Sequence, residues 1–211
     1  NDTLIKEKMK KEILEWMFCI VIALVLAIIF KHFIGTPTTV KHSSMYPTLQ
    51  ENEKLVLNRT FKITKKYPNR GDIITFEAPS KASYSKFEAS QSNPVAIYNS
   101  PKKNIFQSFW YYGLEVTKTS FIKRVIGLPG EHVKIENGKI YINGSELKED
   151  YLADDVITVS EVFYDFTVPD GYIFAIGDNR SKSTDCRVFG CVPYEKIEGI
   201  VLLRFFPFDV F

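Results

Sequence analysis

The feature that most constrains this chain is an uncharged apolar run near its N-terminus. Residues 16–30 read WMFCIVIALVLAIIF, with no charged side chain. The apolar character extends over residues 13–34 if the charges of Glu15 and Lys31 reach a membrane interface. About 20 such residues are enough for a helix to span a bilayer. We therefore predict a membrane-spanning helix over residues 13–34.

Two alternatives compete with a retained membrane anchor: a buried core helix and a cleavable signal peptide. Bulky residues and no Ala-x-Ala site follow the run, which favours an anchor that is kept. Lysines are more frequent before the run than after it, where only Lys31 and Lys41 lie close; those before it are Lys6, Lys8, Lys10 and Lys11. This bias predicts a single-pass protein of the cell membrane with residues 1–12 in the cytoplasm and residues 35–211 outside the cell membrane.

The chain after the anchor is predicted to form a mainly antiparallel β domain. Alternating or β-branched runs bounded by turn residues recur at 52–61, 70–79, 121–127, 132–147, 170–180 and 197–208. Two Asn-Gly pairs within residues 132–147 are typical of tight hairpin turns. Residues 79–120 are rich in Ser, Lys and aromatic side chains. We interpret them as an insertion to which no regular structure can be assigned.

Aromatic residues and cysteines leave two questions open. Rings gather in residues 106–116 and 204–211, where they favour either a membrane interface or the protein core. Cys186 and Cys191 would lie in a compartment where oxidation is possible, but the sequence does not say whether their Cβ atoms face each other.

The 27 Lys and Arg nearly balance the 25 Asp and Glu, and we expect no nucleic-acid partner.

Reactive hydroxyl groups follow the anchor in the stretch KHSSMYPTL, residues 41–49. A serine becomes a nucleophile only if a nearby base takes its proton. A Ser-His-Asp triad stays open as one arrangement, with three histidines available: His32, His42 and His132. Their spacing does not favour a metal site, and we expect no metal or cofactor.

Lysine is the other base that could serve, if burial lowers its pKa enough for a neutral amine to exist near pH 7. Lys123 has apolar neighbours in the segment FIKRVIGLPG, unlike most lysines of the chain, which lie in polar runs. A lysine within a strand often points into solvent, so this pattern alone is a weak indication.

Several segments together resemble the bacterial type I signal peptidases, membrane-anchored Ser-Lys proteases that remove signal peptides from exported proteins. SSMYPTL is similar to the family's Ser-Met-x-Pro-Thr-Leu box, and IKRVIGLPGE to the box that carries the catalytic lysine. GDNRSKSTDCR, residues 177–187, is similar to the Gly-Asp-Asn-Arg-x-x-Ser-x-Asp-Ser-Arg box, and RGDIITF to a strand of the substrate groove. The resemblance covers nearly the whole chain, in the single-anchor form of Gram-positive bacteria, and implies the family's signal-peptidase/LexA-like β fold.

The resemblance implies roles for residues at the matching positions. Ser44 would be the nucleophile, Lys123 the general base, and Ser183 a hydrogen-bond partner that orients the lysine amine. Asp185 and Arg187 would form an ion pair that shapes the site, with Asp178 in support. The Ser44 backbone N–H would stabilise the oxyanion, and His42 could supply a second donor, although the family often has Gly or a hydroxyl residue there. Cys186 replaces the usual Ser and adds a redox-sensitive atom.

The resemblance also implies a substrate. An exported preprotein would add as an extended strand beside residues 72–76 and 121–123, with Ala-like side chains one and three residues before the cut. The bilayer would be the other partner. Each candidate for the substrate groove could equally be an ordinary core residue; the candidates are Val40, Met45, Leu49, Asp72, Thr75, Phe121 and Ile122.

Other functions remain compatible with an anchored β domain of this kind. A non-cleaving paralogue could bind exported subunits, such as pilins, and assist their assembly. The unusual His42 and the insertion could instead mark a peptidase dedicated to one substrate. A domain with structural duties alone would not need Ser44, Lys123 and Ser183 together.

Overall fold

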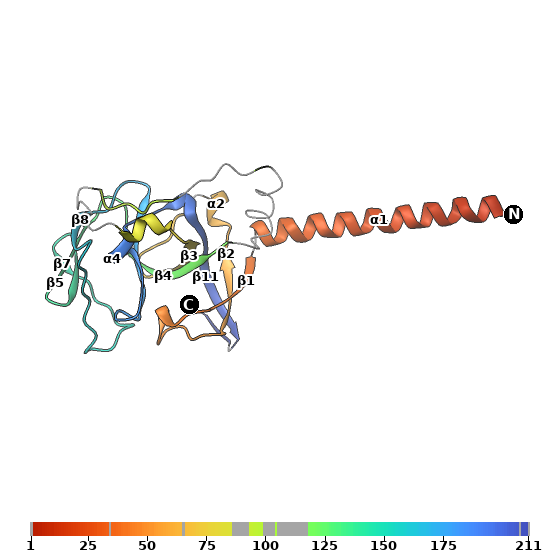
Figure 1. Cartoon of the computed structure of the whole chain (residues 1–211). Coiled ribbons are helices and arrows are strands. Elements are labelled where there is room, and N and C mark those ends of the chain that lie inside the picture. Colours follow the sequence, from red (N-terminus) through yellow and green to blue (C-terminus); the bar gives the residue numbers. More distant parts are fainter. Residues whose placement is uncertain are drawn as a thin grey trace.

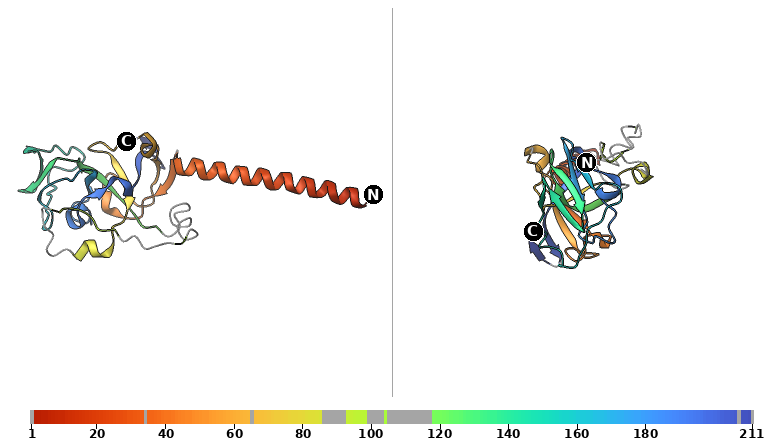
Figure 2. Two further views of the ribbon diagram at one scale, coloured as in Figure 1. Left: turned by 90° about the horizontal axis from the view of Figure 1, so that it is seen from above. Right: turned by 90° about the vertical axis from the view of Figure 1, so that its left-hand side faces the viewer.

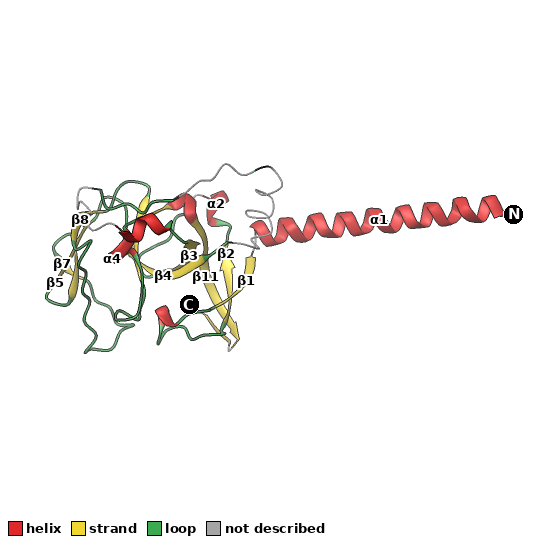
Figure 3. Cartoon of the chain, in the orientation of Figure 1, coloured by secondary structure: helices red, strands yellow, loops and turns green. Residues whose placement is uncertain are grey.

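The chain folds as one long helix followed by a body of short strands (Figures 1 and 3). The computed structural model describes residues 2–33, 35–64, 66–85, 93–98, 104, 118–206 and 208–210. After the long helix, the helical segments in these ranges are only one or two turns long: η1 (Ser43–Met45), α2 (Phe61–Thr64), η2 (Lys81–Ser85), α4 (Cys186–Phe189) and η4 (Tyr194–Lys196).

The long helix, α1 (Asp2–Phe33), projects away from the body in Figure 1 and in the left view of Figure 2, which is turned by 90°. Its side chains from residue 6 to residue 29 are all exposed. The stretch Lys6–Ile29 is long and apolar enough to cross a membrane. The exposure of these side chains contradicts the alternative of a buried core helix. The helix begins well before residue 13, because the lysine-rich N-terminal segment continues the same helix.

The larger sheet has eight strands and is antiparallel throughout. Its order is β1-β2-β11-β3-β4-β9-β10, with β12 paired to β11. Pro37 lies in β1, which is an edge strand, and edge strands are where sheets tolerate proline because it has no N–H for the ladder. The strands are β1 (Gly35–Thr39), β2 (Lys54–Asn58), β3 (Ile73–Glu77), β4 (Ser120–Gly127), β9 (Tyr172–Ile176), β10 (Val192–Pro193), β11 (Ile197–Phe206) and β12 (Phe208–Val210).

The smaller sheet lies at the end of the body that is far from α1 (Figure 1). Its order is β7-β6-β5-β8. The turn between β5 and β6 has Asn137 at φ 53° and Gly138 at φ 81°, the left-handed pair that a two-residue hairpin requires. The strands are β5 (His132–Glu136), β6 (Lys139–Ile142), β7 (Ser145–Glu146) and β8 (Asp165–Thr167).

Two clusters of buried apolar side chains hold the body together. The larger contains residues of both sheets, such as Phe76, Phe174 and Ile140. The smaller joins β2, β3 and β11 to the chain around η1, and consists of Val40, Met45, Leu49, Leu55, Leu57, Ile73 and Val201. Because Met45 is the last residue of η1, this smaller cluster fixes the position of the neighbouring Ser44.

The structure confirms the predicted fold class, and each of the six strand-like segments contains at least one strand. The short strands β1, β8 and β10 lie outside these segments, and β12 begins only at the last residue of the segment 197–208. Most of residues 79–120, including the aromatic residues 106–116, lies outside the described residues. The other aromatic group is partly in solvent, since Phe206 and Phe208 are mostly exposed. Cys186 and Cys191 are both buried and unpaired.

Candidate active site

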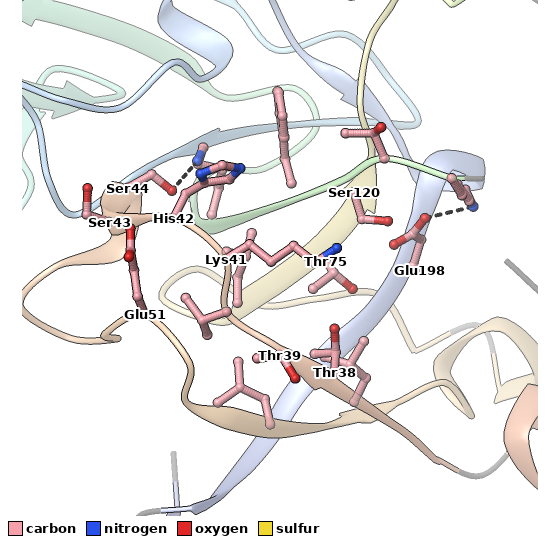
Figure 4. A pocket seen from close by; sticks show the side chains of 18 of the residues that line it. Thr38, Thr39, Lys41, His42, Ser43, Ser44, Glu51, Thr75, Ser120 and Glu198 are labelled. Atoms are coloured by element: carbon pink, nitrogen blue, oxygen red, sulfur yellow. Dashed lines mark hydrogen bonds and ion pairs between the residues drawn. The ribbon is translucent and has the colours of Figure 1, made fainter. Parts of the chain in front are cut away.

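Ser44 and Lys123 meet although 79 positions separate them in the sequence. Ser44 lies in η1, and Lys123 lies in β4. The Lys123 ammonium nitrogen Nζ is 2.6 Å from Ser44 Oγ, the contact drawn as a dashed line beside Ser44 in Figure 4. A serine hydroxyl in contact with a single amine is the geometry that base-assisted activation of a nucleophile requires.

Lys123 lies in an environment that favours its neutral form. Its side chain is 3% exposed and approaches the ring of Phe121, with Nζ 5.4 Å from the ring centroid. Burial lowers the pKa of Lys123 to about 8, although the negative charges of Asp185 and Asp178 act in the opposite direction. About a tenth of the amine is then neutral at pH 7. Burial in the fold is therefore what lowers the pKa of this lysine, in the direction that its apolar sequence neighbours predict.

Main-chain bonds hold Ser44 in place. The backbone N–H of Asn179 donates to the Ser44 carbonyl oxygen at 3.0 Å, and the Asn179 side-chain amide donates to the Ser43 carbonyl oxygen at 3.0 Å. Ser44 is in the first turn of η1, where backbone N–H groups have no partner within the helix. Its own N–H is therefore suited to meet an oxygen of a bound molecule.

The segment 177–187 forms a network around Asp185. Arg187 donates to both carboxylate oxygens of Asp185, at 2.8 and 2.9 Å. Asp185 also accepts the Gly177 backbone N–H at 3.0 Å and the Arg187 N–H at 3.2 Å. The expected pair of Asp185 and Arg187 is thus present in the structure.

Ser183 differs from the expectation. Its Oγ is enclosed and has no hydrogen-bond partner within the described ranges, so it does not hold the Lys123 amine in this state. Gly177 shows how close Ser183 lies to Ser44. A Cβ added at Gly177 would be 2.1 Å from Ser183 Oγ and 2.4 Å from the Ser44 carbonyl oxygen. Ser183 and Ser44 therefore pack against the same glycine.

Asp178 binds residues that the sequence analysis did not single out. Arg124 donates to its two carboxylate oxygens at 2.9 and 2.6 Å, and Thr48 donates to it at 2.6 Å. The signal for Arg124 was present in the segment FIKRVIG, because a charged residue within a buried apolar run requires a partner. Asp178 thus links β4, which carries Lys123, to the turn that follows Ser44.

A cavity of about 790 Å³ extends beside Ser44 and Lys123 (Figure 4). Of the predicted groove residues, Val40, Thr75, Phe121 and Ile122 line this cavity, as does His42. Met45 and Leu49 are fully buried in the smaller apolar cluster, because η1 and the turn after it fold back onto β2. They support the cavity wall and do not line it.

Asp72 also lies away from the cavity lining. Its carboxylate accepts the Asn69 backbone N–H at 2.8 Å and so closes the turn before β3. His132 lies on β5, where its Nε2 is 2.8 Å from Asp165, so it is not the partner of Ser44. Within the described ranges, no three His, Cys, Asp or Glu side chains group as metal ligands.

Burial controls the chemistry of the two cysteines in the body. Cys186 and Cys191 are both fully enclosed, and burial raises the pKa of each thiol. A protonated and inaccessible thiol is unreactive. The replacement of Ser by Cys at position 186 therefore does not place a reactive group at the site in this state.

Comparison with known proteins places this site in context. The family model described as "Signal peptidase, peptidase S26" matches residues 13–206. Signal peptidase I P of Bacillus subtilis subsp. natto is 34% identical over 96% of this chain and 93% of its own length. Signal peptidase IB of Staphylococcus aureus is 31% identical over 96% and 94%. A signal peptidase I crystal structure from Enterococcus faecalis is 30% identical, covers 64% of this chain and 96% of its own, and has a TM-score of 0.39.

Proposed function

This chain belongs to the signal peptidase family, peptidase S26, and from that premise we propose that it removes N-terminal signal peptides from exported preproteins with Ser44 and Lys123. Membership makes it a serine endopeptidase. The observation that supports these two residues above all is the 2.6 Å contact of Ser44 Oγ with a buried lysine of lowered pKa.

Acylation begins when Lys123 is neutral. Its amine takes the Ser44 proton as Oγ attacks the scissile carbonyl carbon, and the carbonyl oxygen becomes an oxyanion. The Ser44 backbone N–H stabilises this charge, and His42 on the cavity wall is the candidate second donor. The C–N bond then breaks, Lys123 returns its proton to the leaving amine, and the signal peptide stays bound to Ser44 as an ester.

Deacylation uses the same groups with water in place of the amine. Lys123 takes a proton from water, the resulting oxygen attacks the ester carbon, and the lysine passes the proton to Ser44 Oγ as the ester breaks. The enzyme returns to its starting state with neutral Lys123. Asp185 and Arg187 hold the loop beside Ser44, and the bond between Asp178 and Arg124 holds β4.

The anchor determines where this reaction takes place. With α1 in the bilayer and the lysine-rich N-terminus in the cytoplasm, the body would lie outside the cell membrane. A preprotein emerging from the same bilayer would then meet the cavity directly. Tethering enzyme and substrate to one surface raises their effective concentration.

The first test is cleavage of a preprotein with an Ala-x-Ala site by the full chain in detergent, read by N-terminal sequencing of the product. We expect a cut after the final Ala, and loss of the cut with Ser44→Ala or Lys123→Met. Ser43→Ala is the matched control, since the contacts described for Ser43 are made by its main chain, and it should retain cleavage.

Cleavage by Ser44→Ala would overturn the assignment of the nucleophile. A preprotein that stays bound but uncut by the wild-type chain would instead favour a non-cleaving assembly factor for exported subunits.

A further inference from the structure

One hydroxyl group on the cavity wall makes no hydrogen bond to the part of the chain that the structure describes. The Thr75 side chain is 5% exposed, and its Oγ1 is enclosed without a hydrogen-bond partner among the residues that the structure describes. An enclosed hydroxyl with no partner is destabilising. Valine would fill the same space without this cost. The hydroxyl at this position therefore calls for a partner that comes from outside the chain.

Thr75 lies within the cavity and away from the nucleophile. Figure 4 shows Ser44 at one end of the lining, Glu198 at the other, and Thr75 between them. The surroundings of Thr75 combine apolar wall residues, such as Ile122 and Leu57, with polar ones. The exposed side chain of Lys41 extends across the cavity toward Thr75 in Figure 4, so a peptide that displaces it reaches the hydroxyl.

Among the residues that the structure describes, the edge of β4 that faces away from β3 is unpaired before Arg124, and this edge indicates how a peptide would lie in the cavity. β9 pairs with β4 from Arg124 onward, and residues 118–123 of the preceding segment line the cavity. An extended peptide adds to such an edge through main-chain bonds. The scissile carbonyl must lie at Ser44, and this places the rest of the peptide along the lining.

The position of α1 gives the direction of that peptide. Pro37 lines the cavity and is four positions after Phe33, the last residue of α1. From Pro37 the chain continues as an extended segment toward Ser44. A signal peptide is apolar before its cut and would leave the bilayer on the side of α1. Residues before the cut therefore lie on the Thr75 side of Ser44.

Side-chain alternation then selects one position of the peptide. In an extended chain, the first and third residues before the cut face the same side, about 7 Å apart. The first lies next to Ser44, and the third lies further toward α1. On the paired strands β3 and β4, Thr75 lies opposite Ile122, and the neighbouring residue Ile74 lies opposite Lys123. The third residue before the cut is therefore the one that reaches Thr75.

We propose that Thr75 makes this cleft select preproteins with a hydroxyl-bearing side chain, Ser or Thr, at the third residue before the cut, over an apolar side chain of equal size. The inference rests on the proposed function and adds a substrate preference to it. A threonine hydroxyl both donates and accepts, so Thr75 Oγ1 pairs with a second hydroxyl in either direction. An apolar side chain leaves Thr75 enclosed and unpartnered.

The test crosses two enzymes with two preproteins. The preproteins carry either Thr or Val, which have the same shape, at the third residue before an otherwise identical cut site. For the chain with its anchor in detergent, we expect kcat/KM to be roughly five- to tenfold higher for the Thr preprotein. Thr75→Val should bring this ratio to about one or below, and Thr75→Ser should retain a preference for Thr.

Two controls separate recognition from a general loss of structure. Thr167→Val changes an exposed threonine on β8, and the ratio should stay as in the wild type. The same Thr-to-Val exchange at the second residue before the cut, where the side chain faces the other way, should change kcat/KM little.

The outcomes distinguish this inference from the proposed function. Equal cleavage of both preproteins by the wild-type chain, a ratio unchanged by Thr75→Val, or a preference confined to the second residue would each overturn the role of Thr75 alone. The wild-type ratio decides the matter even if Thr75→Val does not fold. If the wild-type chain cuts neither preprotein nor the Ala-x-Ala substrate, the proposed function is overturned together with this inference.

Discussion

At the scale of single residues, the charge of Lys123 controls the proposed reaction. The amine can take the Ser44 proton only when it is neutral, and burial lowers its pKa to about 8. Below this value the neutral fraction falls tenfold with each pH unit. We therefore expect kcat/KM to rise with pH up to about 8 and then to level off, measured with a peptide substrate that has no group titrating between pH 6 and 9.

The same charge has a consequence for folding. Because the folded-state pKa lies below the ordinary value for lysine, the unfolded chain binds more protons than the folded chain between the two values, and stability rises with pH there. A thermal shift measured in parallel should therefore show no loss of folding between pH 7 and 9. A rate that is independent of pH from 6 to 9 would contradict Lys123 as the base.

Residues that the sequence patterns missed share one property. Arg124 and Thr48 both bind Asp178, although they lie 54 and 130 residues before it in the sequence. Neither residue has a catalytic role in the motifs. A motif matches residue types along the chain, whereas a buried carboxylate is satisfied by whichever donors the fold brings to it. Ser183 illustrates the reverse case, since its motif position implies a bond to Lys123 that this state of the structure lacks.

At the scale of elements, the turn that follows β9 is the tightest point of the site. Gly177 has no room for a side chain, because Ser183 Oγ and the Ser44 carbonyl oxygen would lie 2.1 and 2.4 Å from its Cβ. We expect Gly177→Ala to shift η1 or the segment around Ser183 and to lower kcat/KM at least a hundredfold. Cleavage of the preprotein and circular dichroism of the same sample would measure this.

Gly144 offers a matched control for that variant. It has a positive φ of 81° and nothing within 4 Å of an added Cβ, so Gly144→Ala introduces backbone strain without a clash near Ser44. Gly144→Ala should lose about 1–2 kcal/mol of stability and keep its activity. If Gly177→Ala were as active as Gly144→Ala, the close packing of Ser44 on this turn would not matter for cleavage.

Strands were easier to predict than the elements between them. The runs at 52–61 and 132–147 alternate over several residues, and each matched a strand or a hairpin. β1 escaped prediction because Thr and Pro dominate Gly35–Thr39 and no apolar alternation marks it; its pairing with β2 defines it as a strand. η1 likewise has no regular apolar pattern in its sequence. Its position is set by Met45, which packs in the smaller apolar cluster.

At the scale of the whole molecule, α1 and the body have separable tasks. Both apolar clusters lie in the body, and the side chains of residues 6–29 are exposed. We therefore expect a shortened variant that starts at residue 35 to fold and to cleave a soluble peptide within about twofold of the full chain. With a preprotein inserted in liposomes, it should be at least tenfold slower than the full chain reconstituted in the same vesicles.

The vesicle assay separates the role of the anchor from that of the catalytic body. Equal rates of the two forms on the inserted preprotein would show that α1 contributes nothing to the meeting of enzyme and substrate. A shortened variant that fails on the soluble peptide as well would show instead that the body depends on α1 for its fold.

The sequence by itself determined the long apolar helix, most of the antiparallel strands and the identity of Ser44 and Lys123 as candidates, because hydrophobic periodicity and short motifs are local properties of a chain. Only the tertiary structure decided that Ser44 Oγ lies 2.6 Å from Lys123 Nζ and that Met45 supports the cavity wall without lining it. It alone also showed that Thr75 Oγ1 has no hydrogen-bond partner among the described residues. Contacts between distant segments depend on how two apolar clusters pack, and no local pattern encodes that packing.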